Sequence, residues 1–128
     1  MVIDEKILDD LTEQAKASPR LRMNYDLRTT AEDKSQRMLN AIEPGTEVPV
    51  HRHRNTNETV ICVRGRLRQC MYDDSGKIIE EIEMVPGGAI ASIPAGVWHN
   101  VISLESGTVL FEAKDGAYAP FSPEDIMQ

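Results

Sequence analysis

The chain has 128 residues, of which 41% are hydrophobic and 27% are charged, and this is enough for one domain with a sizeable core. Its net charge of −7 argues against general binding to nucleic acid or to an anionic membrane surface, whereas small polar or anionic ligands are compatible with it. No apolar run approaches the roughly 20 residues of a membrane span, and the N-terminus lacks the basic and apolar regions of a signal peptide. We therefore expect a cytoplasmic protein.

The first 30 residues predict a helix followed by an edge strand. Apolar side chains recur at helical spacing from residue 3 to about residue 17, Asp4 is placed as the N-cap, and Ser18 with the following proline ends the helix. Over residues 20–28 apolar and polar side chains alternate, which is the period of a strand with one covered face. Residues 1–30 are thus expected to form an extension that packs against the rest of the domain or a partner.

Residues 31–116 predict a series of short strands separated by turns. We expect strands near residues 36–42, 47–53, 58–64, 66–72, 77–85, 90–93 and 108–114 and in the stretch after His99. Many short strands with Gly/Pro turns and little helix indicate an all-β barrel of the jelly-roll type. Residues 117–128 contain two prolines and are expected to form an extended tail over the surface or over a dimer partner. The three parts together predict one structural domain.

All three histidines of the chain lie in two spaced motifs. The first, GTEVPVHRHRNTNETVICVRG, covers residues 45–65. Because alternate side chains of a strand point to the same face, His51 and His53 can aim at one ion, and Glu58 supplies an oxygen from the next strand. The second motif, GAIASIPAGVWHN, contains a Pro-x-Gly turn that redirects the chain so that His99 reaches the same point. Three imidazoles and one carboxylate therefore predict one metal site.

Both motifs resemble those of the cupins, with one departure, because Ser103 stands where cupins usually carry asparagine. Within the cupins the chain is similar to the WbuC family of cupin-fold metalloproteins, which is found with bacterial surface-polysaccharide gene clusters. The segments that carry the resemblance cover nearly the whole chain and are ASPRLRMN, QRMLNAIEPGTEVPVHRH, VRGRL, PAGVWH and FEAKDGAY. The resemblance implies a cupin barrel (a double-stranded β-helix or jelly roll) with a short N-terminal helix, and a homodimer formed through edge strands or exchanged termini. It implies a metal site but no established reaction.

The ligand set defines the chemistry that we expect. Neutral imidazoles and a carboxylate suit Fe, Mn, Zn, Ni or Co, and the ligands alone do not select one of these metals. Four protein ligands leave one or two positions for water or substrate, unlike a closed structural zinc site. We expect a metal-dependent enzyme, an isomerase, epimerase or dioxygenase, that acts on a sugar nucleotide or sugar-derived acid. A role in bacterial surface polysaccharide (O-antigen) biosynthesis follows only from the resemblance, and the alternative is a non-catalytic module that binds metal and ligand.

Several side chains near the motifs are candidates for substrate binding. Five arginines lie in or just after the first motif, at positions 52, 54, 64, 66 and 68. Arg64 and Arg66 suit bidentate binding of carboxylate or phosphate, and Trp98 offers a stacking surface for a sugar ring. The alternatives are an outer strand face on which arginines pair with glutamates 80, 81 and 83, and a tryptophan that only packs.

Proton-transfer groups and cysteines are less informative. Four side chains could act as a general acid or base, namely Glu47, Tyr72, Glu112 and Lys114. None has a spacing that identifies it, and an exposed ion pair explains Glu112 with Lys114 equally well, so we assign no catalytic residue. Cys62 is expected to be a small buried hydrophobe, and both cysteines are expected to be free thiols, because their spacing fits no redox or zinc motif.

Overall fold

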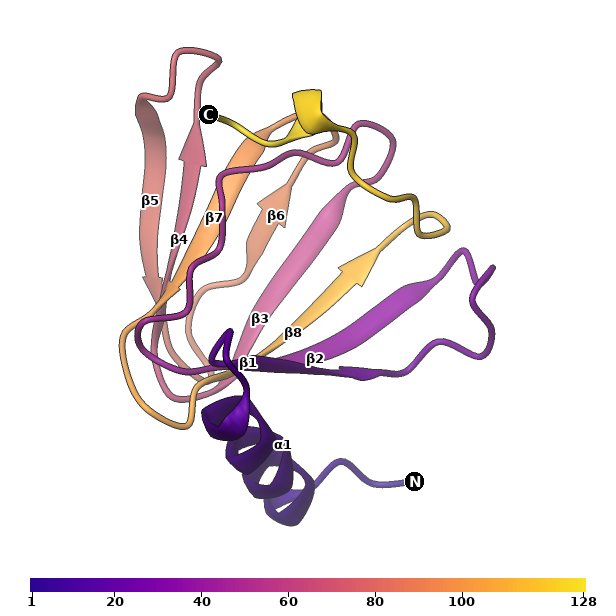
Figure 1. Ribbon diagram of the computed structural model, residues 1–128, viewed down its shortest axis with the longest axis vertical. Helices are drawn as coiled ribbons and strands as arrows, with labels where there is room; N and C mark the ends of the chain where they lie inside the picture. Colours follow the sequence, from indigo (N-terminus) through magenta and orange to yellow (C-terminus); the bar gives the residue numbers. More distant parts are fainter.

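The computed structural model describes all 128 residues and consists of two antiparallel β-sheets that face one another, with one helix on the outside (Figure 1). The elements are α1 (Glu5–Ala17), β1 (Arg22–Asp26), β2 (Gln36–Ile42), β3 (Glu58–Arg64), β4 (Leu67–Tyr72), β5 (Ile78–Met84), β6 (Ala91–Ile93), β7 (Trp98–Ser103), β8 (Val109–Lys114) and the short 3-10 turn η1 (Pro123–Asp125). One sheet has the order β1-β2-β8-β3-β6 and the other the order β5-β4-β7. No helix is long and apolar enough to cross a membrane.

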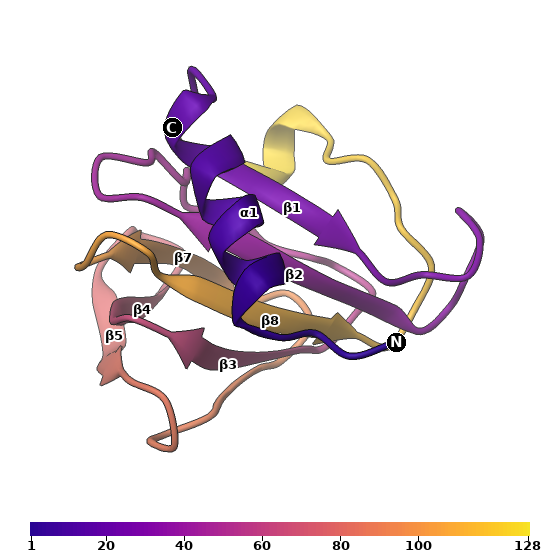
Figure 2. The same cartoon turned by 90° about the horizontal axis from the view of Figure 1, so that it is seen from below.

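Helix α1 begins and packs as its sequence predicts. The carboxylate of Asp4 accepts a hydrogen bond from the backbone N–H of Ile7 at 3.2 Å, which satisfies one of the free N–H groups of the first turn. Figure 2 shows the helix lying across the outer face of the five-stranded sheet. A core of six buried residues joins the two elements: Leu8, Leu11, Ala15, Leu39, Ala41 and Val109. Each buried leucine stabilises this contact by about 2 kcal/mol, so the helix is firmly attached.

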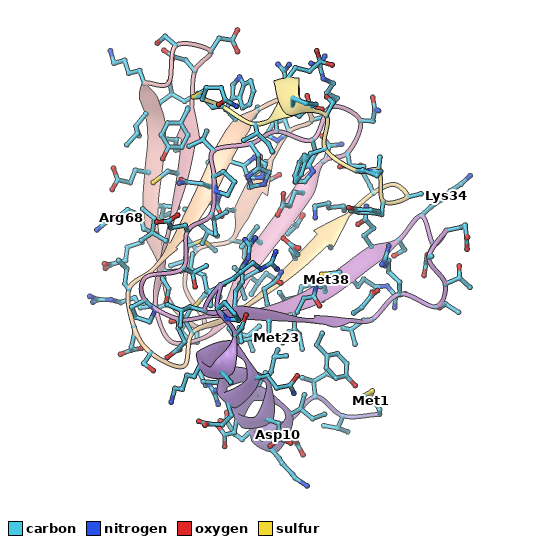
Figure 3. All side chains as sticks on the ribbon, in the orientation of Figure 1. Met1, Asp10, Met23, Lys34, Met38 and Arg68 are labelled. Carbon is cyan, nitrogen blue, oxygen red and sulfur yellow. The ribbon has the colours of Figure 1, made fainter.

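The strands beneath α1 have a second, inward-facing row of side chains. Because neighbouring residues of a strand point to opposite faces, Met23 of β1 lies on the side of α1 while Met38 of β2 faces the space between the sheets (Figure 3). Part of that space is filled by an apolar core of Ile42, Val60, Cys62, Leu67, Met71, Met84, Ala91, Ile93 and Leu110. The rest is lined by polar residues and forms a cavity. The predicted edge strand is confirmed as β1, at the end of the sheet.

The prediction of a strand over residues 47–53 is wrong. Residues 47–53 run as an extended segment whose only bridges join His51 to His99 and to Ile126. Pro49 has no N–H to donate to a neighbouring strand. The segment is held instead by reciprocal backbone hydrogen bonds between His51 and His99, at 3.0 and 2.8 Å, and by the N–H of Met127, which donates to Val50. The segment is therefore joined to β7 through one residue pair, His51 with His99.

Two positions of the sequence motifs have clear structural roles. Gly65 lies between β3 and β4 with a φ of +81°, and a Cβ there would lie 2.7 Å from the Cα of Thr108, so only glycine fits. Ser103, which stands in place of the usual asparagine, donates from its hydroxyl to the carbonyl of Glu105 at 3.1 Å. Both residues thus shape the turns at the end of the barrel where β3 joins β4.

Candidate metal centre

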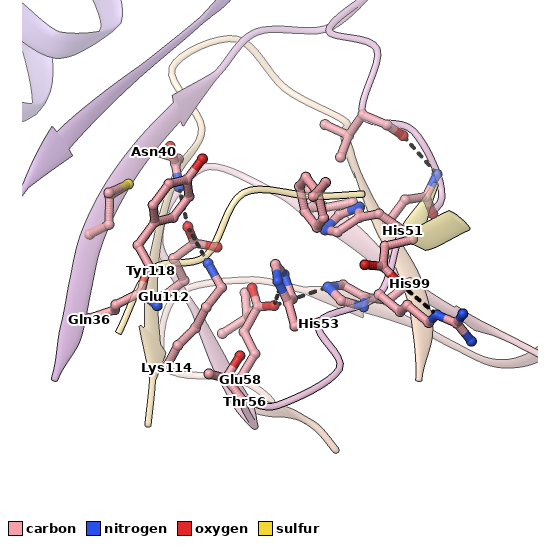
Figure 4. Close-up of a pocket in the computed structure, with 18 of the residues that line it drawn as sticks. Gln36, Asn40, His51, His53, Thr56, Glu58, His99, Glu112, Lys114 and Tyr118 are labelled. Atoms are coloured by element: carbon pink, nitrogen blue, oxygen red, sulfur yellow. Dashed lines mark hydrogen bonds and ion pairs between the residues drawn. The ribbon is translucent and has the colours of Figure 1, made fainter. Parts of the chain in front are cut away.

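The structure gathers the three histidines between the sheets and places Glu58 next to two of them. His51 and His53 come from the extended segment, Glu58 is the first residue of β3, and His99 is the second residue of β7. The ring nitrogens of the three histidines lie within 4.8 Å of one another. Figure 4 shows Glu58 beside them, with its Oε2 at 3.0 Å from Nε2 of His99 and at 3.3 Å from Nε2 of His53. We call these four residues the metal centre.

Backbone carbonyls select the tautomer of two of these histidines. The Nδ1 of His51 lies 2.7 Å from the carbonyl oxygen of Pro49, and the Nδ1 of His99 lies 2.9 Å from that of Val97. A carbonyl oxygen only accepts, so each Nδ1 carries the proton, and in the neutral ring Nε2 is left with a free lone pair. This is the arrangement by which proteins orient imidazoles toward a metal.

The lone pair of His99 then faces the carboxylate of Glu58. Two acceptor atoms 3.0 Å apart repel one another unless a proton or a metal cation lies at the site. Both residues are buried, with 3% and 5% of their surface exposed, so water does not screen the contact. Three imidazole nitrogens and one carboxylate oxygen fit a divalent transition metal in type and number.

The electrostatics of the metal centre favour the forms of the ligands that bind metals. Burial, together with the nearby charges of His99 and His53, lowers the pKa of His51 to about 4, so its ring is neutral at pH 7. Burial alone raises the pKa of Glu58, but its close contacts with the rings of His53 and His99 outweigh burial and hold that pKa well below its usual range. An ionised carboxylate and a neutral imidazole are the forms that metal ligation requires.

A cavity of about 670 Å³ opens beside the metal centre. This volume lies in the range of pockets that hold small molecules. Glu112 and Lys114 line the cavity with side chains only 18% and 15% exposed, so they are not an exposed surface pair. Glu112 accepts from the amide of Asn40 at 3.0 Å, and burial, together with the negative charge of Glu58, raises the pKa of Glu112 to about 7 (Figure 4).

The C-terminal tail crosses the same cavity. Its residues from Ala117 to Phe121, with Asp125 and Ile126, form part of the lining. The ring of Phe121 lies 5.1 Å from that of His51 and 5.2 Å from that of His53, measured between centroids. The tail that the sequence places over the surface or a dimer partner thus lies against two of the candidate metal ligands of its own chain.

The anchor of the tail is one aspartate. Asp125 is 8% exposed and accepts from Arg54 at 2.6 Å and from Arg52 at 3.1 Å. The hydrogen bond from Arg54 is the main reason that the pKa of Asp125 falls to about 2. Arg52 also lies over the ring of Trp98, 4.5 Å from its centroid. Two arginines of the first motif are therefore used to attach the tail.

The structure does not bring Arg64 or Arg66 to the cavity, contrary to the expectation from sequence. The pairing of β3 with β8 shifts its register between Cys62 and Arg64, and this bulge turns Arg64 from the inner to the outer face. There its guanidinium contacts α1, with Asp9 at 2.7 Å and Glu5 at 3.1 Å. Arg66 lies on the outer side of β4 and pairs with Glu83 at 3.7 Å, as the alternative interpretation predicts.

The other sequence candidates also lie outside the cavity lining. Trp98 is 9% exposed and donates from its indole N–H to Asp74 at 3.1 Å. Cys62 is buried in the apolar core as a free thiol, as expected. Tyr72 donates to Asn100, and Glu47 is exposed on the extended segment. Of the four candidate proton-transfer groups, the structure therefore brings only Glu112 and Lys114 to the site.

Two arginines that sequence reasoning missed do line the cavity. Arg20 lies just before β1 and Arg22 is its first residue. The alternation over residues 20–28 already separates Arg22 and Asn24 from the apolar residues of that strand. The alternation predicts a strand with one covered face, and the structure shows that its polar face also lies inside, as part of the cavity lining.

Comparison with known proteins agrees with this architecture. Residues 3–84 match the family described as Domain of unknown function (DUF6016), and no curated protein matches the sequence. KdgF from Halomonas sp. aligns with a TM-score of 0.63 and 15% identity, over 79% of this chain and 84% of KdgF. CapF from Staphylococcus aureus, a capsular polysaccharide assembling protein, aligns with a TM-score of 0.70 and 22% identity, over 86% of this chain but 32% of CapF.

A third similar structure is a recombinant oxalate oxidase in complex with glycolate. It aligns with a TM-score of 0.66 and 16% identity, over 79% of this chain and 54% of the oxidase. All three are cupins, so the chain has the cupin fold that its motifs predict. At these identities the similarity concerns the fold alone.

Proposed function

Since this chain belongs to the family described as Domain of unknown function (DUF6016) and has the cupin fold, we propose that it binds one divalent metal ion at the metal centre. We propose further that it is a metal-dependent enzyme acting on a small polar or anionic substrate, such as a sugar nucleotide or a sugar-derived acid. The observation that carries the proposal is the contact between Nε2 of His99 and Oε2 of Glu58, two buried acceptor atoms that a shared cation would reconcile.

The surroundings of the metal centre support a catalytic role over a purely structural one. When bound, the metal supplies Lewis-acid chemistry of the kind that isomerases and epimerases use or, if it is iron, the dioxygen chemistry of a dioxygenase. The protein supplies a cavity of ligand size beside it. Asn40, Glu112 and Lys114 present an amide, a carboxyl group and an amine to that cavity, where they can bind and orient a polar substrate. Phe121 adds an aromatic ring to the cavity lining on the side of the tail.

The biological context rests on the sequence segments that resemble the WbuC family. That resemblance supports a role in bacterial surface polysaccharide (O-antigen) biosynthesis. A similar structure, CapF, is itself described as a capsular polysaccharide assembling protein, although its 22% identity to this chain extends only to the fold.

Metal content tests the proposed ligand set directly. The protein is purified anaerobically without a metal-affinity column, and its metal is measured by elemental mass spectrometry. We expect about one equivalent in the wild type and a loss of most of it in Glu58→Gln and His99→Ala, because each variant removes a donor atom. The matched control is Glu43→Gln, which replaces another buried carboxylate that binds only Ser106 and Gly107. Wild-type protein without metal, or full occupancy in both ligand variants, would contradict the proposal.

The same variants separate an enzyme from a non-catalytic module whose metal holds the barrel. None of the four residues of the metal centre belongs to the apolar core between the sheets. We therefore expect the thermal midpoint of the wild type to change little when a chelator removes its metal, and the midpoint of His99→Ala to stay close to that of the metal-loaded wild type. A large fall of the midpoint on metal removal would favour the structural role instead.

A further inference from the structure

Two arginines of this acidic protein have no acidic partner. Seven of the nine arginines lie within 4.0 Å of a carboxylate oxygen, and these are Arg28, Arg37, Arg52, Arg54, Arg64, Arg66 and Arg68. The two that form no ion pair are Arg20 and Arg22, although the chain has 21 acidic residues. Neither guanidinium group forms a hydrogen bond within the protein, and both residues line the cavity. The positive charges of the two unpaired arginines thus lie at one wall of the cavity.

The backbone between the two arginines is constrained. Leu21 has a φ of +57°, the left-handed conformation that a leucine rarely adopts. Its N–H donates to Ser18 at 3.0 Å, and its carbonyl accepts from the N–H of Glu43 at 2.9 Å and from the hydroxyl of Thr46. Residues in such conformations cluster at sites where a fixed geometry serves a function. The hydrogen bonds on both sides of Leu21 hold the two arginines at the cavity wall.

The positive charges of Arg20 and Arg22 also repel one another. Arg22 is half-buried, and burial, followed by the charge of Arg20, lowers its pKa. Guanidinium groups are suited to bidentate hydrogen bonds with carboxylate and phosphate oxygens. An oxyanion between Arg20 and Arg22 would supply the missing hydrogen bonds and remove the repulsion.

The register of the strands places this pair far from the metal centre. Arg22 is paired with Ile42 at one end of β2, whereas Gln36 at the other end pairs with Lys114, which in turn pairs with Glu58. Six residues of strand separate Gln36 from Ile42, which corresponds to roughly 20 Å along β2. Asn24 and Asn40 line the cavity between these ends. A ligand that reaches both ends is therefore elongated and polar.

We propose that Arg20 and Arg22 form an oxyanion-binding subsite, which holds the phosphate or carboxylate group of an elongated polar ligand whose other end reaches the metal centre. The statement about the other end rests on the proposed function, whereas the subsite itself does not need the metal. A sugar phosphate, a sugar nucleotide or a sugar acid has the required length and charge.

Binding of small anionic probes tests the subsite. Glucose 1-phosphate, glucuronate and neutral glucose are titrated by calorimetry at low ionic strength into the full-length wild type and into Arg20→Gln/Arg22→Gln. The control is Arg66→Gln/Arg68→Gln, which changes the net charge by the same two units on an outer face where both arginines pair with glutamates. We expect the first double variant to bind the anions at least about tenfold more weakly and the control to bind them as the wild type does. Thermal unfolding of each variant confirms that it is folded.

The outcomes separate the possible ligands and the two proposals. Tighter binding of glucose 1-phosphate identifies a phosphate subsite, and tighter binding of glucuronate a carboxylate subsite; either supports the inference. Three outcomes would overturn it. The affinity for the anions could fall equally in both double variants, it could be unchanged in Arg20→Gln/Arg22→Gln, or the wild type could bind neither anion. The titrations are repeated with His99→Ala, in which the subsite is expected to bind its anion without metal. Anion binding by wild-type protein that is found to contain no metal would leave the subsite standing and contradict the metal centre.

Discussion

At the scale of single residues, one bulge decides what Arg64 does. On a regular β3 it would share the inner face with Glu58, Val60 and Cys62, but the register shift after Cys62 sends it outward. It then bonds to the carbonyls of Leu8 and Gly107 and to the hydroxyl of Thr12, at 3.1, 2.9 and 2.9 Å, besides two carboxylates of α1. A side chain expected to bind substrate instead connects the helix to the barrel.

This role predicts a stability effect at Arg64. Because Arg64→Ala leaves the carbonyl of Gly107 and the buried hydroxyl of Thr12 without this partner, we expect it to lower the free energy of unfolding by about 2 kcal/mol. The exposed pair of Arg68 with Glu81 contributes little, so Arg68→Ala should change stability by no more than about 0.5 kcal/mol. Urea unfolding measures the free energy of unfolding of both variants, provided that their m-values equal that of the wild type. Equal effects of the two variants would show that Arg64 does not attach the helix.

At the scale of elements, the tail and the extended segment 47–53 support one another. The N–H of Arg52 donates to Asp125 at 3.0 Å, and the N–H of Met127 donates to Val50 at 2.8 Å. The two segments together carry His51, His53 and Phe121, so the position of the tail determines how the histidines are covered. Neither segment forms a regular strand, and their contacts with each other replace a sheet ladder.

Because ion pairs of Asp125 attach the tail, we expect a substitution of this residue to loosen it. In Asp125→Asn we expect the amides of Arg52 and Met127 to exchange with solvent several-fold faster at pH 7, because the charges of Arg52 and Arg54 lose their partner. Asp26→Asn breaks a comparable ion pair with Arg28 at the edge strand and serves as the control, with no change at these amides. Unaltered exchange in Asp125→Asn would mean that other contacts suffice to hold the tail.

The pH dependence of the tail follows from the same aspartate. Hydrogen bonds, chiefly from Arg54, lower the pKa of docked Asp125 to about 2 from 3.8. A carboxyl group with a lowered pKa stabilises the docked state above its ordinary pKa, and this stabilisation disappears as the pH falls from 3.8 toward 2. NMR shifts of the Met127 amide should therefore be constant from neutral pH to about pH 4 and change only below it. A change centred near pH 6 would point to another group.

At the scale of the whole molecule, the five-stranded sheet separates two apolar cores, one on each of its faces. Its outer face packs on α1 (Figures 1 and 2). Its inner face lines the apolar core and the cavity. The two sheets have four edge strands, which are β1 and β6 in the larger sheet and β5 and β7 in the smaller one. The edge at β5 exposes Ile78 and Ile79, which are 45% and 62% exposed. Open edges of this kind are where further chains can add.

We expect a homodimer that uses the N-terminal edge or exchanged termini. Light scattering at micromolar concentration should give a mass of twice 14.3 kDa, and a monomer mass would contradict the prediction. Ile79→Lys separates the edge at β5 from the edge at β1, because it places a charge on β5 and leaves β1 unchanged. Dissociation of the dimer by this variant would show that the interface lies at β5 rather than at the N-terminal edge.

The sequence by itself determined the features that depend on local spacing. The alternation of His51 with His53, the distance to Glu58 and the Pro-x-Gly turn before His99 predicted side chains that the structure brings together. The cap at Asp4 and most strand positions also followed from sequence, because capping and the two-residue period of a strand act between near neighbours.

Only the tertiary structure decided which distant segments share a surface. The bulge that redirects Arg64 exists because β3 pairs with β8, some fifty residues later in the chain. From the sequence, Glu112 and Lys114 could equally well be an exposed ion pair. In the structure the facing sheet and the tail enclose them. The arginines at the start of β1 meet the cavity because α1 covers the opposite face of their sheet. Long-range packing, not local propensity, therefore set the chemistry around the metal centre.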